Sequence, residues 1–531
     1  MLNTARATHA VAVAPHHLAA QSALAVMREG GNAIEAMVAA AATIATVYPH
    51  MNGIGGDSFW IILPPGAAPI AIDACGPAAQ SASIDAYQLR GLSTIPVRGP
   101  LAANTVAGTL GGWHAASLLA TELGGTMPVS RLLADAIGYA ENGVPVTVSQ
   151  QNATAAKFSE LKEQPGFCDQ FLIDGELPKA GQRFIQPRLA RTLSMLVHDG
   201  LDSYYRGPLA KEIAADLQAV GSFVTGADLA AFHAKRTVPL HLAHSEGDLY
   251  NMTPPTQGVV SLTILGLLDR IGLSNVEADS ADHVHLVVEA TKRAFRMRDT
   301  HVTDPAEMPI DAQHLLDGTH LTTLAADIRL DQAAPWGEGK GPGDTIWMGV
   351  IDQNGLAVSF IQSIYHEFGS GVVLPTTGIN WQNRGASFSL DATHLLALKP
   401  GKKPFHTLNP AAARLKDGRV MVYGTMGGDG QPQTQAAVFT RYVVFGQPLQ
   451  TSVTAPRWLL GRTWGQSSDT LKLEQRFPQA VVEELARRGH DVEVLAAYDE
   501  TMGHAGAIVR HPDGMLEGAT DPRSDGGVAA W

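Results

Sequence analysis

Thr345 stands where a polar glycine loop meets an apolar segment, in the sequence GEGKGPGDTIWMGVI. A threonine hydroxyl is a poor nucleophile unless a base removes its proton. An N-terminal threonine can use its own α-amine for this, because the pKa of that amine is about 7.7 to 8.0. In the intact chain the amine is part of the bond between Asp344 and Thr345. Thr345 can therefore act as a self-activated nucleophile only after this bond is cut.

The same hydroxyl could make the cut. Attack by the Thr345 hydroxyl on the Asp344 carbonyl moves the acyl group from nitrogen to oxygen, and water then hydrolyses the ester. The glycine loop before Thr345 would give the chain the reach and the strain that this step needs. Threonine is also common as an ordinary first residue of a strand, so the local pattern leaves both interpretations open.

Gly427 and Gly428 form a second candidate group, in the loop TMGGDGQPQ between a predicted strand and a predicted helix. Backbone amides in such a loop can converge and stabilise the oxyanion of an acyl-transfer intermediate. A plain turn or a phosphate-binding loop would use glycines in a similar way. A P-loop does not fit, because no Lys-Ser/Thr pair follows these glycines and Lys340 is followed by Gly341.

A metal site is not expected at the sequence HVH, which contains His283 and His285. Residues two apart on a helix point to nearly opposite faces, so these two rings would not converge on one ion. We therefore predict no metal.

The composition is typical of a large globular enzyme, with 531 residues of which 45% are hydrophobic and 17% charged. The net charge of −13 and the lack of a dense Lys/Arg cluster argue against a nucleic-acid partner. The apolar segment 36–48 is too short to cross a membrane, and the N-terminus does not resemble a signal peptide. Cys75 and Cys168 fit a reducing compartment at least as well as a disulfide, so we expect a cytoplasmic location.

An α/β arrangement would position the candidate residues. The hydrophobic pattern predicts helices over 18–29 and 33–47, followed by a strand in NGIGGDSFWIIL, and a mostly helical region from 105 to 330. TIWMGVI and LAVSFI are predicted to pair as an antiparallel hairpin across the turn DQNG. GRVMVYG is predicted as another strand, and TQAAVFTRYVVF as the helix after the glycine loop.

Several segments resemble the γ-glutamyltransferase family of N-terminal nucleophile hydrolases. DTIWMGVIDQNGLAVSFIQSIYHEFGSG is similar to the autocleavage segment of that family, and GGNAIEAMVAAA, NGIGGDSF, GKKPFHTLNPA, GTMGGDG and GATDPRSDGG are in family order. The resemblance covers nearly the whole chain. It implies a four-layer αββα sandwich cut into a large subunit, residues 1–344, and a small subunit, residues 345–531. The two pieces would stay together as a heterodimer, alone or as a dimer of heterodimers, and would need no cofactor.

The resemblance also assigns roles to single residues. Thr345 would be both the processing residue and the nucleophile, and Ser363 would stand where the family has a second hydroxyl that supports the first. Gly427 and Gly428 would match the glycine pair whose amides form the oxyanion hole. Taken alone, Ser363 would be an unremarkable polar residue near a strand end.

The groups with which the family grips a glutamyl substrate are missing. Where the family has an arginine for the α-carboxylate, the sequence is IDACGPAAQSA, with Cys75 at or near that place. Where it has an acid for the α-amino group, NRGASFS has Ala386 and Ser387. Without these charge partners a zwitterionic γ-glutamyl group would be bound poorly.

Larger groups replace the small polar ones of the family pocket, because its Ser-Ser pair becomes His406-Thr407 and an asparagine becomes Tyr365. SIYHEFGSGVVLP, KGPGD and PFHTLNPAAARL are similar to segments of family members that hydrolyse oxamate, a small anionic amide. The implied reaction gives oxalate and ammonia, in purine or allantoin nitrogen catabolism. His406, Thr407 and Arg384 are the candidates for binding the carboxylate, although Arg384 could be a surface residue and His406 a packing residue.

Two other functions stay open at this point. One is a γ-glutamyl hydrolase or transferase, or an acylase for another small amide, whose pocket uses different anchors. The other is a binding protein that neither cuts itself nor acts on amides.

Overall fold

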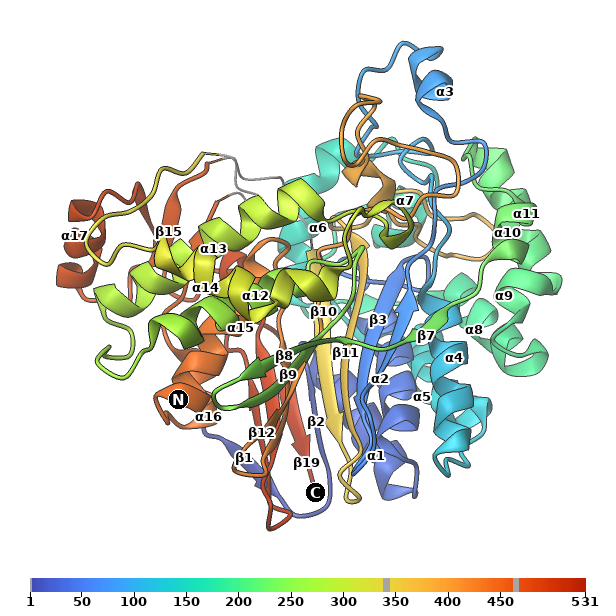
Figure 1. Cartoon of the computed structure of the whole chain (residues 1–531). Coiled ribbons are helices and arrows are strands. Elements are labelled where there is room, and N and C mark those ends of the chain that lie inside the picture. The colour runs from blue at the N-terminus through green and yellow to red at the C-terminus, as the bar shows by residue number, and fades with distance from the viewer. Residues whose placement is uncertain (1, 338–343, 462–467) are drawn as a thin grey trace.

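Two seven-stranded antiparallel sheets form the centre of the molecule (Figure 1). The computed structural model describes residues 2–337, 344–461 and 468–531, with the backbone alone for Asp344. The predicted glycine loop at 338–343 lies outside the described residues. The first sheet has the order β1 (Ala5–Ala7), β18 (Leu516–Thr520), β17 (Gly506–Arg510), β13 (Val420–Gly424), β12 (Ala411–Leu415), β9 (Gly247–Asn251), β8 (Leu240–His244). The second sheet has the order β19 (Gly527–Ala530), β2 (Val11–Ala14), β10 (Asp344–Ile351), β11 (Ala357–Tyr365), β3 (Asp57–Leu63), β4 (Ile70–Ala74), β7 (Lys235–Thr237).

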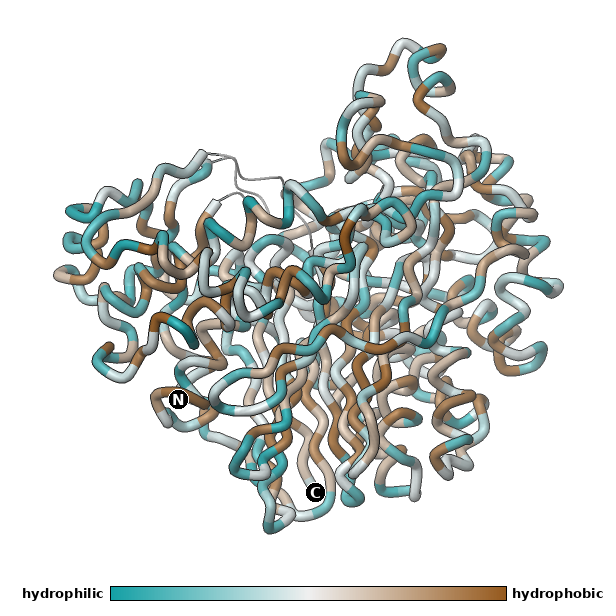
Figure 2. Tube along the Cα trace, in the orientation of Figure 1, coloured by the Kyte–Doolittle hydropathy of each residue, from teal (hydrophilic) through white to brown (hydrophobic). Residues whose placement is uncertain are grey.

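Helices cover the outer face of each sheet, so the molecule has four layers (Figure 1). The second sheet packs against α1 (His17–Arg28), α2 (Ala33–Val47) and α4 (Thr109–Glu122). Outside these, α5 (Val129–Asn142) packs on α2, and α8 (Pro187–Asp199) packs on α5. The first sheet packs against α12 (Gly258–Ile271) and α15 (Gly430–Phe439), and α13 (Ala281–His301) packs on these two helices. A third apolar cluster fills the space between the sheets. In Figure 2 hydrophobic residues follow these buried faces.

Smaller elements complete the fold. The further helices are α3 (Ile84–Gln88), α6 (Val148–Leu161), α7 (Phe167–Phe171), α9 (Ser203–Arg206), α10 (Pro208–Val220), α11 (Gly226–Ala231), α14 (Gly318–Ala326), α16 (Leu449–Thr454) and α17 (Gln479–Arg487). Two minor sheets contain β14 (Trp458–Leu460), β15 (Leu471–Glu474), β16 (Val492–Leu495), β5 (Val144–Pro145) and β6 (Arg183–Phe184).

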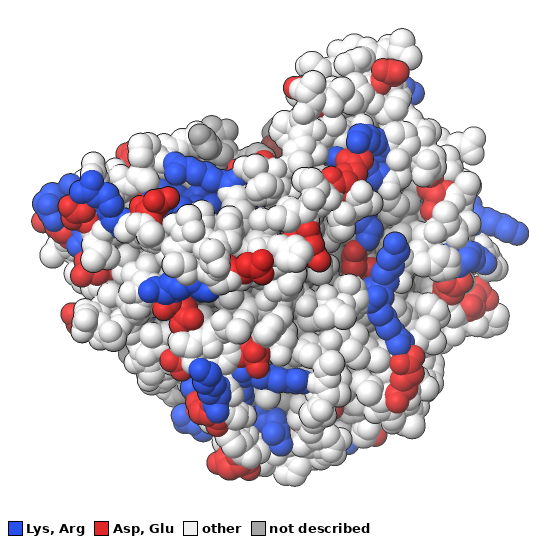
Figure 3. Space-filling model, in the orientation of Figure 1, with Lys and Arg blue, Asp and Glu red and all other residues white. Residues whose placement is uncertain are grey.

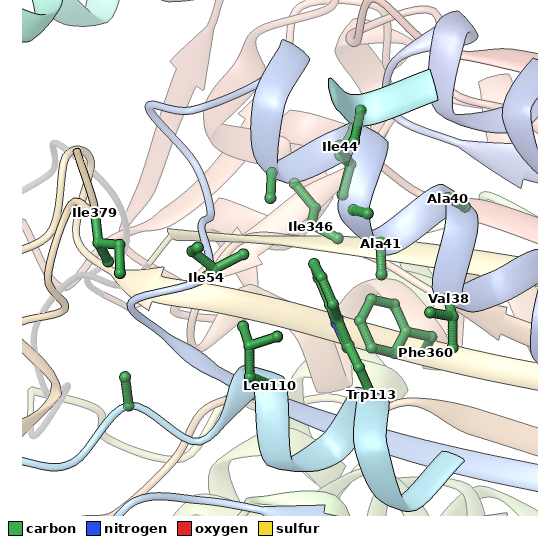
Figure 4. Close-up of a cluster of buried hydrophobic side chains, with 14 of the residues drawn as sticks. Val38, Ala40, Ala41, Ile44, Ile54, Leu110, Trp113, Ile346, Phe360 and Ile379 are labelled. Atoms are coloured by element: carbon green, nitrogen blue, oxygen red, sulfur yellow. The ribbon is translucent and has the colours of Figure 1, made fainter. Parts of the chain in front are cut away.

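The helix α2 is buried along its whole length, as its nearly uninterrupted apolar sequence predicts. It begins with a capping box, in which the Asn32 side chain accepts from the Glu35 amide and the Glu35 side chain accepts from the Asn32 amide. Figure 4 shows its Val38 and Ile44 in the same cluster as Trp113 of α4 and Phe360 of β11. This packing fixes the outer face of β10 and β11.

Side-chain alternation along the second sheet decides which residues face the inner space. In β10, β11 and β3 the even-numbered apolar residues belong to the helix-side cluster, and the odd-numbered ones, such as Trp347, Ile361 and Phe59, belong to the cluster between the sheets. Thr345 and Asp57 are odd-numbered residues at the ends of β10 and β3, the strands on either side of β11. The sheet therefore directs both toward the inner space.

The structure differs from the predicted elements in two places. Residues 240–251 form the hairpin β8–β9 inside the region predicted to be mostly helical. The helix α15 begins at Gly430, four residues before the predicted start, and a π-helical turn over Thr440–Val444 follows it. The first helical amides need no intrahelical acceptor, so Pro432 costs no hydrogen bond there and the glycine-rich sequence hides the helix start.

Candidate active site

Thr345 lies buried at the N-terminal end of β10, between the two sheets. Gln431, in the first turn of α15, donates from Nε2 to Thr345 Oγ1 at 3.4 Å. Gln431 Oε1 accepts from the Asn409 amide at 3.3 Å, which leaves the side-chain nitrogen to face the threonine. The sheet and the start of α15 thus hold the predicted nucleophile from two sides.

Ser363 is near the end of β11, the strand next to Thr345, and its Cα pairs with that of Asp57 in β3. Its hydroxyl accepts from the Tyr365 amide at 2.8 Å. Tyr365 has a φ of +83°, a left-handed conformation that is costly for a bulky residue. This turn ends the strand and brings the Tyr365 ring over Arg384.

Gly427 and Gly428 occupy the loop between β13 and α15, as predicted. Their φ values are +117° and +51°, and the first of these is open only to glycine. The Gly428 carbonyl accepts from Gln257 Nε2 at 2.9 Å. The Gly428 carbonyl shares its peptide plane with the Asp429 amide, so this bond fixes the orientation of the peptide that follows the glycine pair.

Gln257 connects two loops of the site, and sequence reasoning missed it. Its Nε2 donates to the Gly428 carbonyl and, at 3.1 Å, to the Thr407 carbonyl. Arg298 Nη1 donates to Gln257 Oε1 at 3.0 Å and to Asp429 Oδ1 at 2.8 Å, so the orientation of the Gln257 amide is fixed. All these side chains are buried. No local motif signals this role, because Gln257 is more than 80 residues before Thr345 in the chain.

His406 and Asp57 form a buried pair beside Ser363. His406 Nε2 lies 2.9 Å from Asp57 Oδ2, and both side chains are fully buried. Burial, followed by the charge of Arg384, holds the pKa of His406 well below its usual range, so the ring is neutral. Burial raises the pKa of Asp57 to about 7, against the lowering effects of the Gly76 and Gly108 amides. Asp57 was also missed from the sequence, although it lies in the quoted segment NGIGGDSF.

Arg384 is fully buried, so it is not the surface residue that the sequence left open. Its guanidinium carbon lies 3.8 Å from the centroid of the Tyr365 ring. None of its three side-chain nitrogens has a hydrogen-bond partner among the described residues. Burial lowers the pKa of Arg384 to about 10, which still leaves it charged at neutral pH. A buried cation without hydrogen-bond acceptors is expensive, and a bound anion would relieve that cost.

The predicted site residues are therefore linked in one region. Thr345 contacts Gln431, Gly428 is tied to Thr407 through Gln257, and Asp57 lies opposite Ser363. The Thr407 hydroxyl is a further buried polar group without a partner among the described residues. The site thus contains unpaired donors and acceptors around a buried cation.

Comparison with known proteins shows to which family the chain belongs. A profile of the γ-glutamyltranspeptidase family matches residues 19–531. The chain belongs to this family. It is 65% identical to the oxamate amidohydrolase proenzyme of Klebsiella pneumoniae subsp. pneumoniae, over 99% of each chain. The membership predicted from the sequence motifs is confirmed.

Two solved structures of related enzymes have the same fold. Cephalosporin acylase from Bacillus halodurans is 33% identical, with a TM-score of 0.91 over 100% of this chain and 97% of that one. A γ-glutamyltranspeptidase chain from Pseudomonas nitroreducens is 29% identical, with a TM-score of 0.55, and covers 60% of this chain and 95% of that one. The predicted α/β sandwich of the N-terminal nucleophile hydrolases is confirmed, and so is the expectation of an enzyme that hydrolyses amides.

Cys75 is fully buried near Arg384. Burial raises the pKa of its thiol, and the charge of Arg384 acts in the opposite direction to a smaller extent. The neutral thiol and the guanidinium therefore share one region.

Two groups of side chains in the described part of the chain have metal-ligand types at short range. In the group of Asp57, Cys75 and His406, the histidine and the carboxylate are bound to each other and the cation of Arg384 is close by. His285, Glu289 and His490 form the other group. His285 Nδ1 lies 2.8 Å from His490 Nε2, and Lys292 and Arg293 pair with Glu289. Donor atoms in both groups are thus already engaged.

His283 and His285 have different neighbours, as their spacing predicts. His283 Nε2 lies 2.9 Å from Thr440 Oγ1, whereas His285 contacts His490. The HVH sequence therefore does not bring two rings to one point.

A surface cavity of about 590 Å³ lies away from Thr345, and Asp73, Lys235 and Lys403 are in its wall. A neighbouring cavity of about 380 Å³ also contains Lys403 in its wall and reaches Cys75. On the face shown in Figure 3 acidic and basic side chains are interspersed. No helix in the described ranges is long and apolar enough to span a membrane.

Proposed function

We propose that this protein is a self-processing amidohydrolase that converts oxamate to oxalate and ammonia. The observation that carries the proposal is the fully buried guanidinium of Arg384, whose three nitrogens lack partners in the described part of the chain. A small carboxylate would fill this place with charge-assisted hydrogen bonds. The 65% identity to an oxamate amidohydrolase proenzyme supports the same substrate.

Processing would precede catalysis. The Thr345 hydroxyl attacks the Asp344 carbonyl, the peptide C–N bond breaks, and water hydrolyses the resulting ester to free the Thr345 α-amine. The products are residues 1–344 and residues 345–531. The solved γ-glutamyltranspeptidase chain that covers 60% of this sequence supports a division of this kind.

Turnover would follow the same route on the substrate. The Thr345 α-amine takes the hydroxyl proton while the oxygen attacks the amide carbon, and the Gly427 and Gly428 amides bind the oxyanion. The C–N bond breaks, and ammonia leaves with the proton from the amine. Water then attacks the oxalyl ester with the amine as base, which releases oxalate and restores the threonine. Ser363 supports the nucleophile from the next strand.

Substrate binding is assigned to the buried polar groups. Arg384 binds the carboxylate, and Tyr365 holds the guanidinium by its ring face. Thr407 and His406 complete the pocket, and the charge of Arg384 acts on His406. Such a pocket fits a small anion better than a glutamyl group with an α-amino group, because Ala386 and Ser387 offer no carboxylate to bind an ammonium.

The wider setting is part of the same proposal. The free thiols of Cys75 and Cys168 support a cytoplasmic location, and the reaction suits the breakdown of purine or allantoin nitrogen. We place the enzyme there as a heterodimer of the two fragments, alone or paired with a second copy.

Intact-mass analysis and ammonia release test this function together. The purified wild type is expected as two fragments that release ammonia and oxalate from oxamate in equal amounts, and Thr345→Ala as one uncut chain without activity. Cutting without ammonia release would keep the mechanism and reject the substrate. A wild type that stays uncut and inert would reject both.

An acylase that acts on a larger amide is the second candidate, because the structure of a cephalosporin acylase matches the whole chain with a TM-score of 0.91. Release of a chromophore from a γ-glutamyl anilide or of the side chain of a cephalosporin, at rates above those with oxamate, would support this candidate.

A further inference from the structure

The unpaired ring nitrogen of His406 is a polar group that the proposed mechanism does not use. His406 Nε2 faces Asp57 Oδ2 at 2.9 Å, whereas Nδ1 is buried and has no hydrogen-bond partner in the described part of the chain. A buried nitrogen without a partner costs free energy. It therefore indicates a ligand atom that is bound during function.

The surroundings of Asp57 decide which ring nitrogen carries the proton. Asp57 Oδ1 accepts from the Gly76 amide at 3.0 Å, the Gly108 amide at 2.9 Å and Gln382 Nε2 at 3.1 Å. These three groups are donors that favour the ionised carboxylate. An ionised Asp57 can only accept at Oδ2, so the single N–H of the neutral ring belongs on Nε2. His406 Nδ1 then carries a lone pair.

We propose that Asp57 holds His406 in the tautomer whose Nδ1 accepts a hydrogen bond, and that Nδ1 binds an N–H of the substrate amide. Asp57 is then a positioning residue, and His406 determines specificity. The inference rests on the proposed function, because it identifies which end of oxamate each side of the pocket takes. Arg384 binds the carboxylate, and His406 binds the carboxamide nitrogen.

This arrangement distinguishes the substrate from its own product. Oxamate has N–H donors, but oxalate has a second carboxylate in their place. A carboxylate against the lone pair of Nδ1 is repelled, so oxalate is bound more weakly than oxamate and leaves after the ester is hydrolysed. If Asp57 did not fix the tautomer, the opposite tautomer of His406 would donate from Nδ1 and would bind oxalate.

The variant Asp57→Asn tests whether Asp57 fixes the tautomer of His406. The introduced amide keeps an oxygen for the three donors but presents an NH₂ to His406 Nε2, which must accept and so places the ring proton on Nδ1. We expect KM for oxamate to rise about tenfold and the inhibition constant of oxalate to fall about tenfold, because one buried hydrogen bond is lost and another gained. In the control Asp73→Asn, a carboxylate that pairs with Lys403 is removed and the ratio of the two constants stays as in wild type.

A structural role for Asp57 would weaken oxamate and oxalate alike, and that result would overturn the proposal. If Asp57→Asn fails to mature, ¹⁵N NMR of the histidine-labelled, uncut Thr345→Ala variant gives the answer. The His406 resonances, assigned by their loss in Thr345→Ala/His406→Asn, should report an unprotonated Nδ1, and a protonated Nδ1 would overturn the inference. This measurement does not need turnover. It therefore distinguishes a wrong tautomer assignment for His406 from a failure of the wild type to hydrolyse oxamate.

Discussion

The guanidinium of Arg384 lies 3.8 Å from the ring centroid of Tyr365, and both groups sit at the same end of the sheet as Thr345. The contact depends on the left-handed backbone of Tyr365, at a φ of +83°. A strained residue thus presents its ring to a buried cation whose nitrogens have no hydrogen-bond partner in the described part of the chain. Strain of this kind is typical of functional sites, where it holds a group in place.

Removal of the cation tests its role in binding. For Arg384→Gln we expect KM for oxamate to rise about a hundredfold, because charge-assisted hydrogen bonds to the carboxylate are lost. Hydrolysis of the neutral diamide oxamide should change little. The control Arg414→Gln, which removes bonds to the carbonyls of Pro64 and Ala67, should leave both substrates unaffected. An unchanged KM for oxamate in Arg384→Gln would show that the carboxylate binds elsewhere.

The oxyanion loop can be tested through backbone conformation. In Gly427→Ala the new Cβ meets only Gly503, at 3.6 Å from its Cα, but the φ of +117° is not open to alanine. The loop must shift, and we expect kcat to fall about a hundredfold with KM nearly unchanged. Gly489→Ala, at a φ of +98° with open space around it, is the matched control for the conformational cost. Equal kinetics in the two variants would argue against an oxyanion role.

The link through Gln257 predicts coupled effects on processing and turnover. In Gln257→Leu the carbonyls of Gly428 and Thr407 lose their common donor, so we expect both self-cleavage and kcat to slow by about tenfold or more. Gln450→Leu removes a buried amide that bonds the Thr520 carbonyl far from the site. Both variants should lose about 2 kcal/mol of unfolding free energy in urea titrations. Only Gln257→Leu should also slow self-cleavage and turnover. Normal rates in Gln257→Leu would contradict the link.

The pH dependence of oxamate binding should follow Asp57. Its pKa is raised to about 7, mainly by burial, so the carboxylate is ionised above that pH and protonated below it. The titratable groups that interact with Asp57 are His406, Arg384, Cys75, Tyr204 and Tyr205. Burial keeps the thiol, the two phenols and the imidazole neutral, and Arg384 stays charged. Asp57 is therefore the one group of this set whose protonation state changes between pH 6 and 8.

Protonated Asp57 donates to His406 and reverses the tautomer of the ring, so KM for oxamate should rise as the pH falls below about 7. In Asp57→Asn the KM profile should be flat over the same range. The profile of kcat is expected to follow the Thr345 α-amine separately, at a pKa of about 7.7 to 8.0. A KM for oxamate that does not vary with pH in the wild type would contradict this assignment.

Removal of metals should leave the activity intact. The nearest group of metal-ligand types, Asp57, Cys75 and His406, has its carboxylate and imidazole bound to each other next to a cation. We expect dialysis against EDTA to leave ammonia release unchanged and elemental analysis to find less than one zinc ion per chain. Loss of activity that zinc restores would show that this group binds an ion.

The sequence allowed much of the site to be predicted, but not its supporting groups. Thr345 and the glycine pair could be predicted because each stands at a change of pattern and within a family motif. Gln257 could not, because its partners belong to loops more than 140 residues later and only the fold brings them together. Arg384 was a candidate, but a single arginine in a polar segment gives no sign of complete burial. The hairpin β8–β9 was missed because its strands are short and partly exposed.

The strand order of the second sheet affects whether the enzyme can refold after cleavage. Its central order β2, β10, β11, β3 places strands from after residue 344 between strands from before it. Folding of the uncut chain brings these strands together within one molecule, but after the proposed cut between Asp344 and Thr345 the same assembly would require two chains to meet. The mature enzyme therefore becomes a product that its own fragments regain only by a concentration-dependent, bimolecular route. Each chain can therefore fold by the unimolecular route only before the cut.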